Sequence, residues 1–383
     1  MKPRTKKHQS PQTKVKRLRT ELCAAVKERK AEITGLLTAL LARDHALLLG
    51  ETGTAKTMLV ELMSKALSTV YFYWLMTRFT VPEEVFGNFS LQSLKDDKFE
   101  RVTTGKLPEA EIVFLDEVFK ANSSILNAML TLLNERKFHN GTHVVDCPLQ
   151  MVIGASNELP ESKELDALYD RFPIKFWVSY IKDQSSMREM LLADEPEIAT
   201  RLTAAELAQA QAEAAEIALP EKIVDLVLSV KIALEKAGFV ASDRLWRKSL
   251  KLMRALAYLE GESEVTEDHV LILCDVLWKD PKDRQALGQI VTKAANPIAH
   301  QVAELLDAAR ETFSKIPFSE PIEDAETSAT FNIIVDARVQ FNKSIERLHK
   351  MSKRPNNRIT DALEELAEMK KEASRFAAEV AGA

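Results

Sequence analysis

The sequence predicts an α/β protein: a three-layer domain with a parallel sheet, followed by an all-helical domain and a further helical C-terminal region. Short apolar runs of strand length alternate with helix-like segments as far as residue 182, an order typical of a parallel sheet covered by helices. Beyond that point the apolar residues follow the helical period of 3.6. We therefore expect a basic, disordered tail over 1–20, an α/β core over 21–182, a helical domain over 183–280 and a helical region over 281–383.

The core contains five segments with the apolar composition of buried parallel strands. A first helix is expected over 21–43, because apolar residues recur there at helical spacing. Further helices are expected over 56–68 and 122–134. The strand segments are 45–50, 71–76, 112–116, 151–156 and 174–178.

The helical domain is indicated by its helix-start signals. Thr203 and Glu206 have the spacing of a capping box, and Pro220, Ser242 and Thr266 precede further helices. In the last region one apolar stripe recurs at helical spacing and must be buried somewhere. Either it packs on the helical domain or a neighbouring subunit, or it docks a partner. The stripe comprises Ile359, Leu363, Leu366, Met369, Ala373 and Phe376.

Composition limits the class of protein. The chain has 383 residues, a net charge of −5 and 46% hydrophobic residues, values of a globular protein. It has no apolar run of the roughly 18 residues that span a bilayer and no signal peptide, and its three cysteines are scattered. We expect unpaired thiols and a cytoplasmic protein. Residues 1–20 hold eight Lys or Arg and no acid, so this tail is either a solvated end or a contact for nucleic acid or an acidic partner.

Residues 50–57 form a glycine-bearing loop between a predicted strand and a predicted helix. Such a loop directs backbone N–H groups at phosphate oxygens, and the helix N-terminus adds positive charge. Lys56 would then reach the β and γ phosphates of ATP, and Thr57 would ligate Mg²⁺. Ala55 departs from the usual pattern, which has glycine at that position. The loop comprises Gly50, Glu51, Thr52, Gly53, Thr54, Ala55, Lys56 and Thr57.

Two carboxylates follow the third predicted strand, at the sheet edge where ligands of parallel sheets bind. Asp116 can hold the Mg²⁺ shell, and Glu117 can orient or deprotonate the attacking water. An acidic pair after a strand is common at protein surfaces, but its occurrence about 60 residues after the glycine loop is unusual. The two motifs together predict an ATPase.

Four further polar side chains belong to the predicted site or lie beside it. Asn157 follows the fourth predicted strand and could position the water or contact the γ-phosphate. Arg171 precedes the fifth strand. Arg244 and Arg247 lie in the first turn of a helix, where cations oppose the helix dipole. A bound anion such as phosphate would relieve that conflict.

With these motifs the chain resembles the AAA+ superfamily, and within it the MoxR family, closest to its RavA branch. The resemblance covers about residues 25–280. It implies that Asn157 is sensor 1, that Arg171 is an arginine finger reaching a neighbouring subunit's ATP, and that Arg244 is sensor 2. It also implies a ring, usually a hexamer, which remodels other proteins with a partner carrying a von Willebrand factor A domain. The most specific segments are 75–79, 82–87, 107–117, 155–160 and 168–171.

Two insertions also resemble those of this family, one over 88–105 and one over 135–147. The second is expected to be a hairpin with Asn140 and Gly141 as its two-residue turn. His139 would then pair with Thr142, and Phe138 with His143, so the two histidines face opposite sides and do not form a metal site. The insertions are either packed loops or partner contacts, the candidates being Phe86, Lys95, Phe99 and His139.

Other functions remain open at this stage. RavA-like proteins carry a C-terminal extension with a small β-rich domain, whereas residues 281–383 show no alternating strand pattern. A DNA-associated motor or clamp-like ATPase would use the basic tail, and its turnover would depend on DNA and steeply on salt. An assembly scaffold would bind ATP without needing Glu117 and Arg171. A small-molecule kinase is disfavoured, because the finger and lid arginines imply cooperation between subunits.

Overall fold

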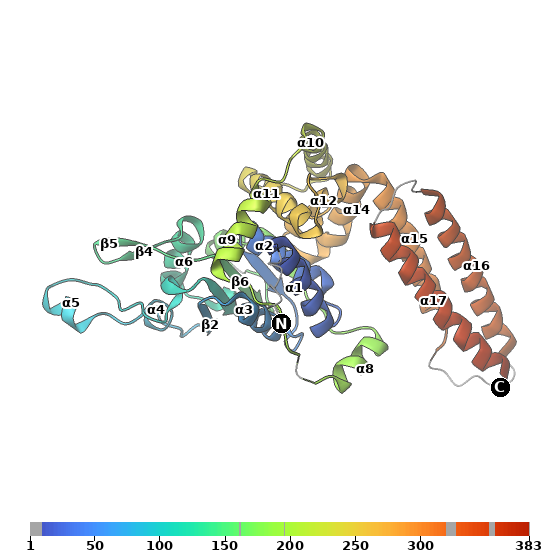
Figure 1. The fold of residues 1–383 in the computed structure, drawn as a ribbon, viewed down its shortest axis with the longest axis horizontal. Helices are drawn as coiled ribbons and strands as arrows, with labels where there is room; N and C mark the ends of the chain where they lie inside the picture. The colour runs from blue at the N-terminus through green and yellow to red at the C-terminus, as the bar shows by residue number, and fades with distance from the viewer. Residues whose placement is uncertain (1–9, 161, 195, 319–326, 352–356, 383) are drawn as a thin grey trace, which may run out of the picture. The chain divides into compact units, whose positions relative to one another are not determined.

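The structure is a computed structural model, and it describes residues 10–382 except 161, 195, 319–326 and 352–356. The chain divides into two compact units, residues 1–288 and 289–383 (Figure 1). This division falls eight residues after the expected end of the helical domain at 280. The first unit holds the sheet and the candidate site.

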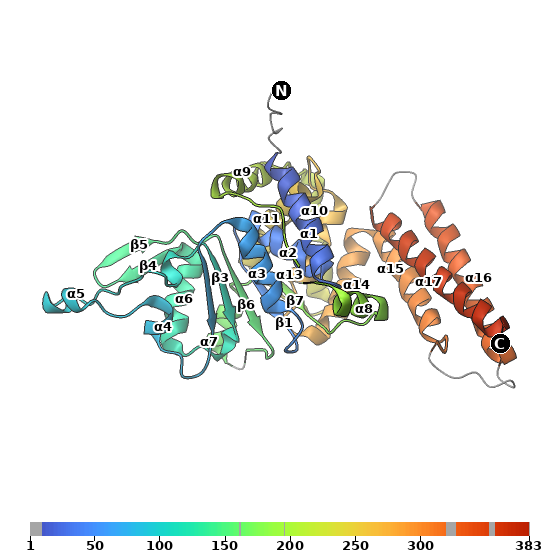
Figure 2. The same ribbon diagram turned by 60° about the horizontal axis from the view of Figure 1, so that its bottom comes forward.

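The sheet of the first unit has five parallel strands in the order β2-β3-β6-β1-β7 (Figure 2). Each of these strands lies within a predicted strand segment, so the α/β prediction is confirmed. The register pairs Leu49 with Ser156 and Leu115 with Gly154, so neighbouring strands end at one edge. The strands are β1 (Ala46–Leu49), β2 (Tyr71–Leu75), β3 (Ile112–Asp116), β6 (Met151–Ser156) and β7 (Ile174–Trp177).

Helices cover both faces of this sheet. Helix α2 packs so closely on one face that a Cβ atom at Gly35 would lie 2.1 Å from the Phe176 ring. Gly154 pairs with Leu47, which in turn pairs with Lys175, the neighbour of Phe176. Because side chains alternate along a strand, Gly154 faces the side opposite to Phe176, and Phe172 packs on that side. The helices of this part are α2 (Lys30–Leu41), α3 (Lys56–Leu67), α6 (Ser123–Glu135) and α7 (Lys163–Tyr169).

The expected disordered tail is wrong for residues 11–20, which belong to helix α1 (Pro11–Ala25). Ser10 caps this helix, and Leu18 and Leu22 are fully buried, so hydrophobic burial outweighs the repulsion among its basic residues. Residues 1–9 lie outside the described residues. The single helix expected over 21–43 is likewise wrong, because Glu28 adopts a left-handed φ of 54° and separates α1 from α2.

The two insertions project side by side from the sheet (Figures 1 and 2). The first follows the short helix α4 (Pro82–Phe86) and contains the short helix α5 (Leu91–Lys95). The second is the hairpin of β4 (Lys137–Asn140) and β5 (His143–Asp146). Short 3₁₀ helices flank β3. They are η1 (Leu107–Glu109) and η2 (Val118–Lys120).

The predicted hairpin register is wrong by one residue. Asn140 pairs with His143, so the turn residues are Gly141 and Thr142. Gly141 supplies the positive φ of 63° that the first turn position requires. His139 pairs with Val144, and the two histidines still lie on opposite faces because side chains alternate along a strand.

The candidate partner contacts in the insertions separate into two kinds. Phe86 is 1% exposed and its ring stacks on Phe138 at 5.5 Å, so its assignment as a partner contact is wrong. Lys95, Phe99 and His139 are exposed. Hydrophobic packing at the base of the insertions explains the difference.

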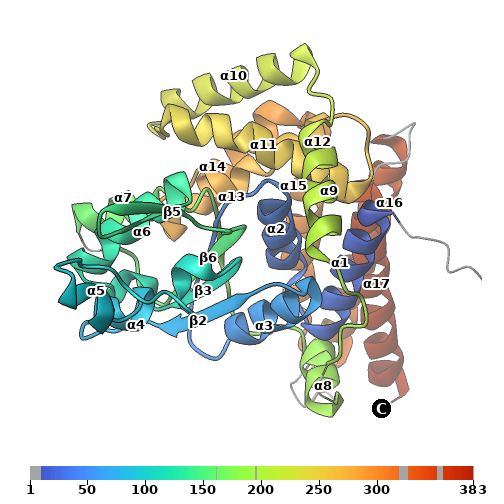
Figure 3. The same cartoon turned by 60° about the vertical axis from the view of Figure 1, so that its left-hand side comes forward.

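Helices follow the sheet up to the end of the first unit, as predicted (Figure 3). The capping box of Thr203 and Glu206 is present at the start of α9, and Ser242 caps α11. The helices are α8 (Gln184–Leu192), α9 (Ala204–Ala215), α10 (Glu221–Lys236), α11 (Asp243–Glu260), α12 (Glu267–Val270), α13 (Leu273–Val276) and the 3₁₀ turn η3 (Pro281–Asp283).

The second unit begins within helix α14 (Arg284–Ala295) and continues as a bundle with its own hydrophobic core. Its helices are α15 (Pro297–Ser314), α16 (Thr327–Met351) and α17 (Asn357–Gly382). The apolar stripe of α17 packs into this core, with Leu366 fully buried and Leu363, Met369 and Phe376 packed around it. Both expected destinations of the stripe, the lid or neighbour and a docked partner, are therefore wrong, because α15 and α16 cover it. No helix in the described part of the chain has the length and apolarity of a membrane span.

Candidate active site

The glycine loop lies between β1 and α3, as the sequence predicts. Gly50 has a φ of 134°, and a Cβ atom there would lie 2.2 Å from the carbonyl oxygen of Val178, so only glycine fits. Gly53 also has a positive φ, of 77°. Ala55, where the usual pattern has glycine, has a left-handed φ of 64° immediately before α3. The backbone therefore follows the glycine-type path although alanine occupies the position.

Lys56 lies inside the loop. Its Nζ donates to the carbonyl oxygens of Gly50 at 2.8 Å and Glu51 at 2.7 Å, and lies 3.3 Å from Thr54 Oγ1. Burial lowers the pKa of the Lys56 ammonium, while the negative charges of Asp116 and Glu117 act to raise it. The lysine and both acidic residues therefore lie close together, as the two motifs predict.

The acidic pair ends β3 next to this loop. Asp116 Oδ1 accepts a hydrogen bond from the backbone N–H of Glu117 at 3.0 Å, which fixes the turn. Glu117 itself has a left-handed φ of 53°. Its Oε2 atom lies 3.3 Å from Lys120 Nζ, yet this buried oxygen has no hydrogen-bond partner among the described residues. A buried carboxylate oxygen without a hydrogen bond is costly even beside the charge of Lys120, and a water molecule bound there would supply that bond.

Asn157 follows β6, the strand between β3 and β1, and its side chain is exposed. The backbone of the same strand end accepts a hydrogen bond from Gly50 N through Ser156 O at 3.0 Å. The strand order thus places Asn157 at the sheet edge between the glycine loop and the acidic pair. This is the place that the sequence predicts for it.

Arg171 and Arg244 form a second group. Arg244 Nη2 lies 3.7 Å from Asp170 Oδ2. Burial, and after it the positive charge of Arg244, lowers the pKa of the Arg171 guanidinium. The Nε atom of Arg171 is buried and has no hydrogen-bond partner within the described ranges. Two neighbouring guanidinium groups, one of them with an unused donor, are chemically suited to an anion.

Sequence reasoning missed Arg29 and Tyr180 beside the glycine loop. The Arg29 guanidinium is 5% exposed and donates to the carbonyl oxygens of Thr54 at 3.4 Å and Ser179. Tyr180 Oη donates to Thr52 O at 3.2 Å. The apolar residues of the expected first helix show a gap at 29–30, between Val26 and Ile33, and that gap was the available signal.

The residues of the glycine loop and the acidic pair fit ATP and Mg²⁺. The Lys56 ammonium is held by the loop's own carbonyls, so the loop is already shaped around a cation that phosphate oxygens can approach. Thr57 follows Lys56 on α3, and Asp116 ends β3, so a hydroxyl and a carboxylate flank the loop. Oxygen donors of this kind are the ones that Mg²⁺ prefers.

Comparison with known proteins agrees with this fold and site. Residues 13–218 match the family described as the MoxR domain in the MoxR-vWA-beta-propeller ternary systems, and residues 222–291 match the AAA lid domain. A five-stranded parallel sheet with a glycine loop, an acidic pair and a helical lid defines an AAA+ ATPase domain. The chain belongs to the MoxR family of AAA+ ATPases.

Several relatives are similar to this chain over much of its length. Two uncharacterised proteins of Methanocaldococcus jannaschii are 36% and 38% identical, over 88% and 79% of this chain and 87% and 82% of their own lengths. Chaperone MoxR1 of Mycobacterium tuberculosis is 25% identical over 63% of this chain and 68% of its own length. A crystal structure of a Cytophaga hutchinsonii protein shares the fold, with a TM-score of 0.62, 20% identity and coverage of 74% of this chain and 94% of that one.

Proposed function

We propose that this protein hydrolyses Mg-ATP in a homo-oligomeric ring, a hexamer, and uses the energy to remodel, activate or assemble a protein partner. The observation that carries the proposal is the buried Glu117 Oε2 atom, which accepts no hydrogen bond among the described residues although Lys120 Nζ lies 3.3 Å away. The charge of the same carboxylate acts on Lys56 in the glycine loop. An unsatisfied carboxylate beside a phosphate-binding loop is suited to hold the attacking water.

The residues of this chain divide the work. The N–H groups of residues 50–57 and the Lys56 ammonium bind the phosphates of ATP. Thr57 and Asp116 would hold Mg²⁺, which neutralises charge on the phosphate oxygens. Glu117 orients or deprotonates the attacking water, and Asn157 positions it from the neighbouring strand. Arg171, with Arg244 beside it, stabilises the transition-state charge on the ATP of the adjacent subunit.

The matched family supports a partner for the ring. Its description names a ternary system of MoxR, a von Willebrand factor A protein and a β-propeller protein, so we propose partners of both kinds. Chaperone MoxR1, a relative, is named as a chaperone, which supports work on proteins rather than on small molecules. The placement near the RavA branch and the cytoplasmic location stay predictions.

The test combines turnover with capture. The Glu117→Gln variant should retain ATP and recover a von Willebrand factor A protein from the native cell extract, whereas Lys56→Ala, which cannot hold ATP, should not. Recovery should require ATP and be absent with ADP. Equal recovery by both variants, or no ATP hydrolysis by the wild type, would overturn the proposal.

The alternative of a DNA-associated motor or clamp-like ATPase is weakened by residues 11–20 only, since Lys2, Arg4, Lys6 and Lys7 lie outside the described residues. Of the basic residues expected in a free tail, Lys14 pairs with Glu206 at 2.6 Å and Arg17 pairs with Glu21 at 2.8 Å. These side chains are engaged within the fold of the first unit. DNA-stimulated hydrolysis that falls steeply with salt would restore this alternative.

A further inference from the structure

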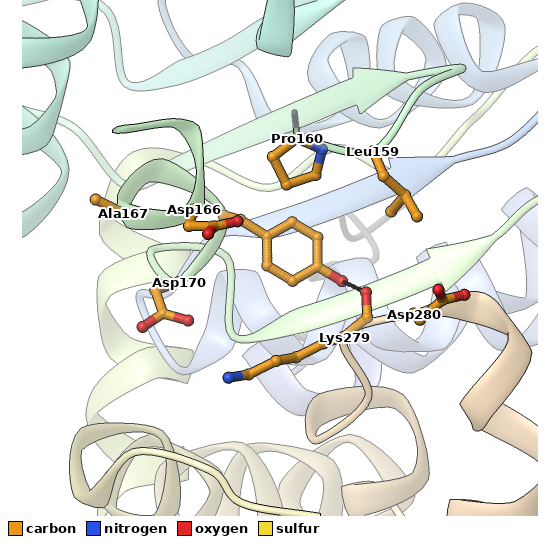
Figure 4. A pocket seen from close by; sticks show the side chains of 8 residues that line it. Leu159, Pro160, Asp166, Ala167, Asp170, Lys279 and Asp280 are labelled. Carbon is orange, nitrogen blue, oxygen red and sulfur yellow. Dashed lines mark hydrogen bonds between the residues drawn. The ribbon is translucent and has the colours of Figure 1, made fainter. Parts of the chain in front are cut away.

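Three polar contacts join the segment that carries Arg171 to the helical lid. Tyr169 Oη donates to the carbonyl oxygen of Lys279 at 2.9 Å (Figure 4). Lys175 Nζ donates to the carbonyl oxygen of Val276 at 2.8 Å. The third contact is that between Asp170 and Arg244. The chain from 169 to 175 is thus attached to the lid on both sides of Arg171.

Lys175 is unusual because it is a lysine buried within a strand, β7. It is 2% exposed, and its Nζ also lies 3.4 Å from the carbonyl oxygen of Phe172, the residue after Arg171. Val276 ends helix α13, where carbonyl groups carry partial negative charge. Burial lowers the pKa of the Lys175 ammonium to about 7, with Asp170 acting to raise it and Lys279 to lower it. Burying an amine costs free energy unless the amine is hydrogen-bonded, as Lys175 is here.

Tyr169 lies in the same cluster and faces the segment that follows the acidic pair. It is 5% exposed, and Lys175 Nζ lies 5.1 Å from its ring centroid. The ring of Phe119, two residues after Glu117, lies 6.1 Å from the Tyr169 ring. Burial raises the pKa of the Tyr169 hydroxyl, so it stays protonated and keeps donating to the lid.

A pocket beside this cluster shows that packing alone does not set the spacing between α7 and the lid. A pocket of about 370 Å³ opens between α7 and the end of the lid, and Tyr169, Asp170, Lys279 and Asp280 line it (Figure 4). The two elements are therefore incompletely packed where they meet, and the directed hydrogen bonds of Tyr169 and Lys175 set their spacing.

We propose that Tyr169 and Lys175 are positioning residues that attach the Arg171 segment to the lid of the same subunit, so that the lid sets where Arg171 points. When ATP or ADP moves the lid, the finger that this subunit offers to its neighbour moves with it. The inference rests on the proposed role of Arg171 in the neighbouring subunit's site.

The experiment uses mixed rings of full-length variants, in which one subunit type offers the finger and the other offers the ATP site. Lys56→Ala subunits cannot hydrolyse ATP but offer Arg171, and Arg171→Ala subunits hold ATP but offer no finger. Equimolar mixing should restore hydrolysis. Tyr169→Phe, which removes one hydroxyl and keeps the ring, is then added to either the finger-offering or the ATP-holding subunit.

Added to the finger-offering subunit, Tyr169→Phe should lower the restored turnover about two- to tenfold, the range expected for one net hydrogen bond. Added to the ATP-holding subunit, it should leave the turnover unchanged. Lys175→Met should give the same asymmetry. Tyr71→Phe is the matched control, since the buried Tyr71 hydroxyl has no hydrogen-bond partner in the described part of the chain.

The outcomes separate the two proposals. Equal losses in both subunits, or no loss in either, would overturn the positioning role while leaving Arg171 as the finger. Failure of the parent mixture to restore hydrolysis would overturn the finger assignment and the positioning role with it.

Discussion

Asn140 and Arg101 exchange two hydrogen bonds between the two insertions. Arg101 N donates to Asn140 Oδ1 at 2.6 Å, and Asn140 Nδ2 donates to Arg101 O at 3.0 Å. The backbone of Phe99 also lies against Gly141, where a Cβ atom would be 2.9 Å from its carbonyl oxygen. The hairpin and the first insertion are therefore joined by hydrogen bonds into one structural element.

Asn140→Ala should uncouple this element. Because both side-chain bonds are lost, amide hydrogen exchange should rise about tenfold or more in residues 89–101 and 137–146 together. Thr142→Ala, at the exposed neighbouring turn position, is the control and should change neither segment. Faster exchange confined to the hairpin would show that the insertions are independent.

Glu117→Gln should bind ATP with near-normal affinity and hydrolyse it at least roughly 100-fold more slowly, because it keeps the shape of the side chain but loses the general base. Lys56→Ala should instead lose ATP binding, since the ammonium lies inside the loop. Equilibrium binding of labelled ATP and single-turnover hydrolysis measure the two effects. Hydrolysis by Glu117→Gln at the wild-type rate would refute the role of Glu117.

Ala55→Gly should stabilise the protein by about 0.5–1 kcal/mol, because the left-handed conformation is strained for alanine and not for glycine. ATP binding should be kept, as the backbone path is unchanged. Thermal unfolding of the first unit compares the two proteins. A lower melting temperature would mean that the methyl group makes a contact worth more than the strain.

Lys175 should make stability depend on pH. Its pKa is about 7 in the folded protein and about 10.4 when unfolded. The folded state therefore disfavours the charged amine, and this penalty is full below pH 7. Between pH 7 and about 10.4 the unfolded state binds the extra proton, so stability rises with pH, by at most about 1.4 kcal/mol per pH unit.

Denaturant unfolding of wild type and Lys175→Met from pH 6 to pH 10 measures this effect. The free energy of unfolding of the wild type should rise relative to the variant across that range. A difference that does not change with pH would show that Lys175 keeps an ordinary pKa.

Residues 297–383 should fold without the rest of the chain, because α15, α16 and α17 bury a core of their own that includes Phe341 and Leu366. The isolated segment should show helical circular dichroism and a cooperative thermal transition. Phe341→Ala should cost about 3–5 kcal/mol and abolish that transition. A gradual, non-cooperative loss of helix in the parent segment would contradict the prediction.

Local patterns in the sequence predicted the strands and the glycine loop, because apolar runs and glycine positions are dictated by nearby residues. The break at Glu28 left only one local sign, the gap in apolar residues between Val26 and Ile33, because contacts distant in sequence fix it. The Glu28 carboxylate accepts from the backbone N–H groups of Lys182 and Asp183, more than 150 residues away. The prediction of the hairpin register was wrong for the same reason. The side chain of Asn140 bonds to the backbone of Arg101, which is distant in sequence, and Asn140 is not a turn residue.

The site was predicted in part. The adjacency of Lys56, Asp116 and Glu117 follows from parallel strands ending at one edge. The proximity of Arg171 to Arg244 depends on how the lid meets β7, which no local pattern encodes. The periodicity of α17 showed that its stripe must be buried, but periodicity cannot tell which helices cover it.

Gly35 shows how far a steric constraint can act from its own position. The atoms nearest to a Cβ placed at Gly35 belong to Phe176 and Ile174 of β7, so any side chain there would push α2 away from Phe176. Arg29, immediately before α2, would move with the helix and lose its hold on the carbonyl of Thr54. In a mutational scan read only by nucleotide affinity, this core glycine would therefore score as a binding residue, and a companion measurement of folding would be needed to classify it correctly.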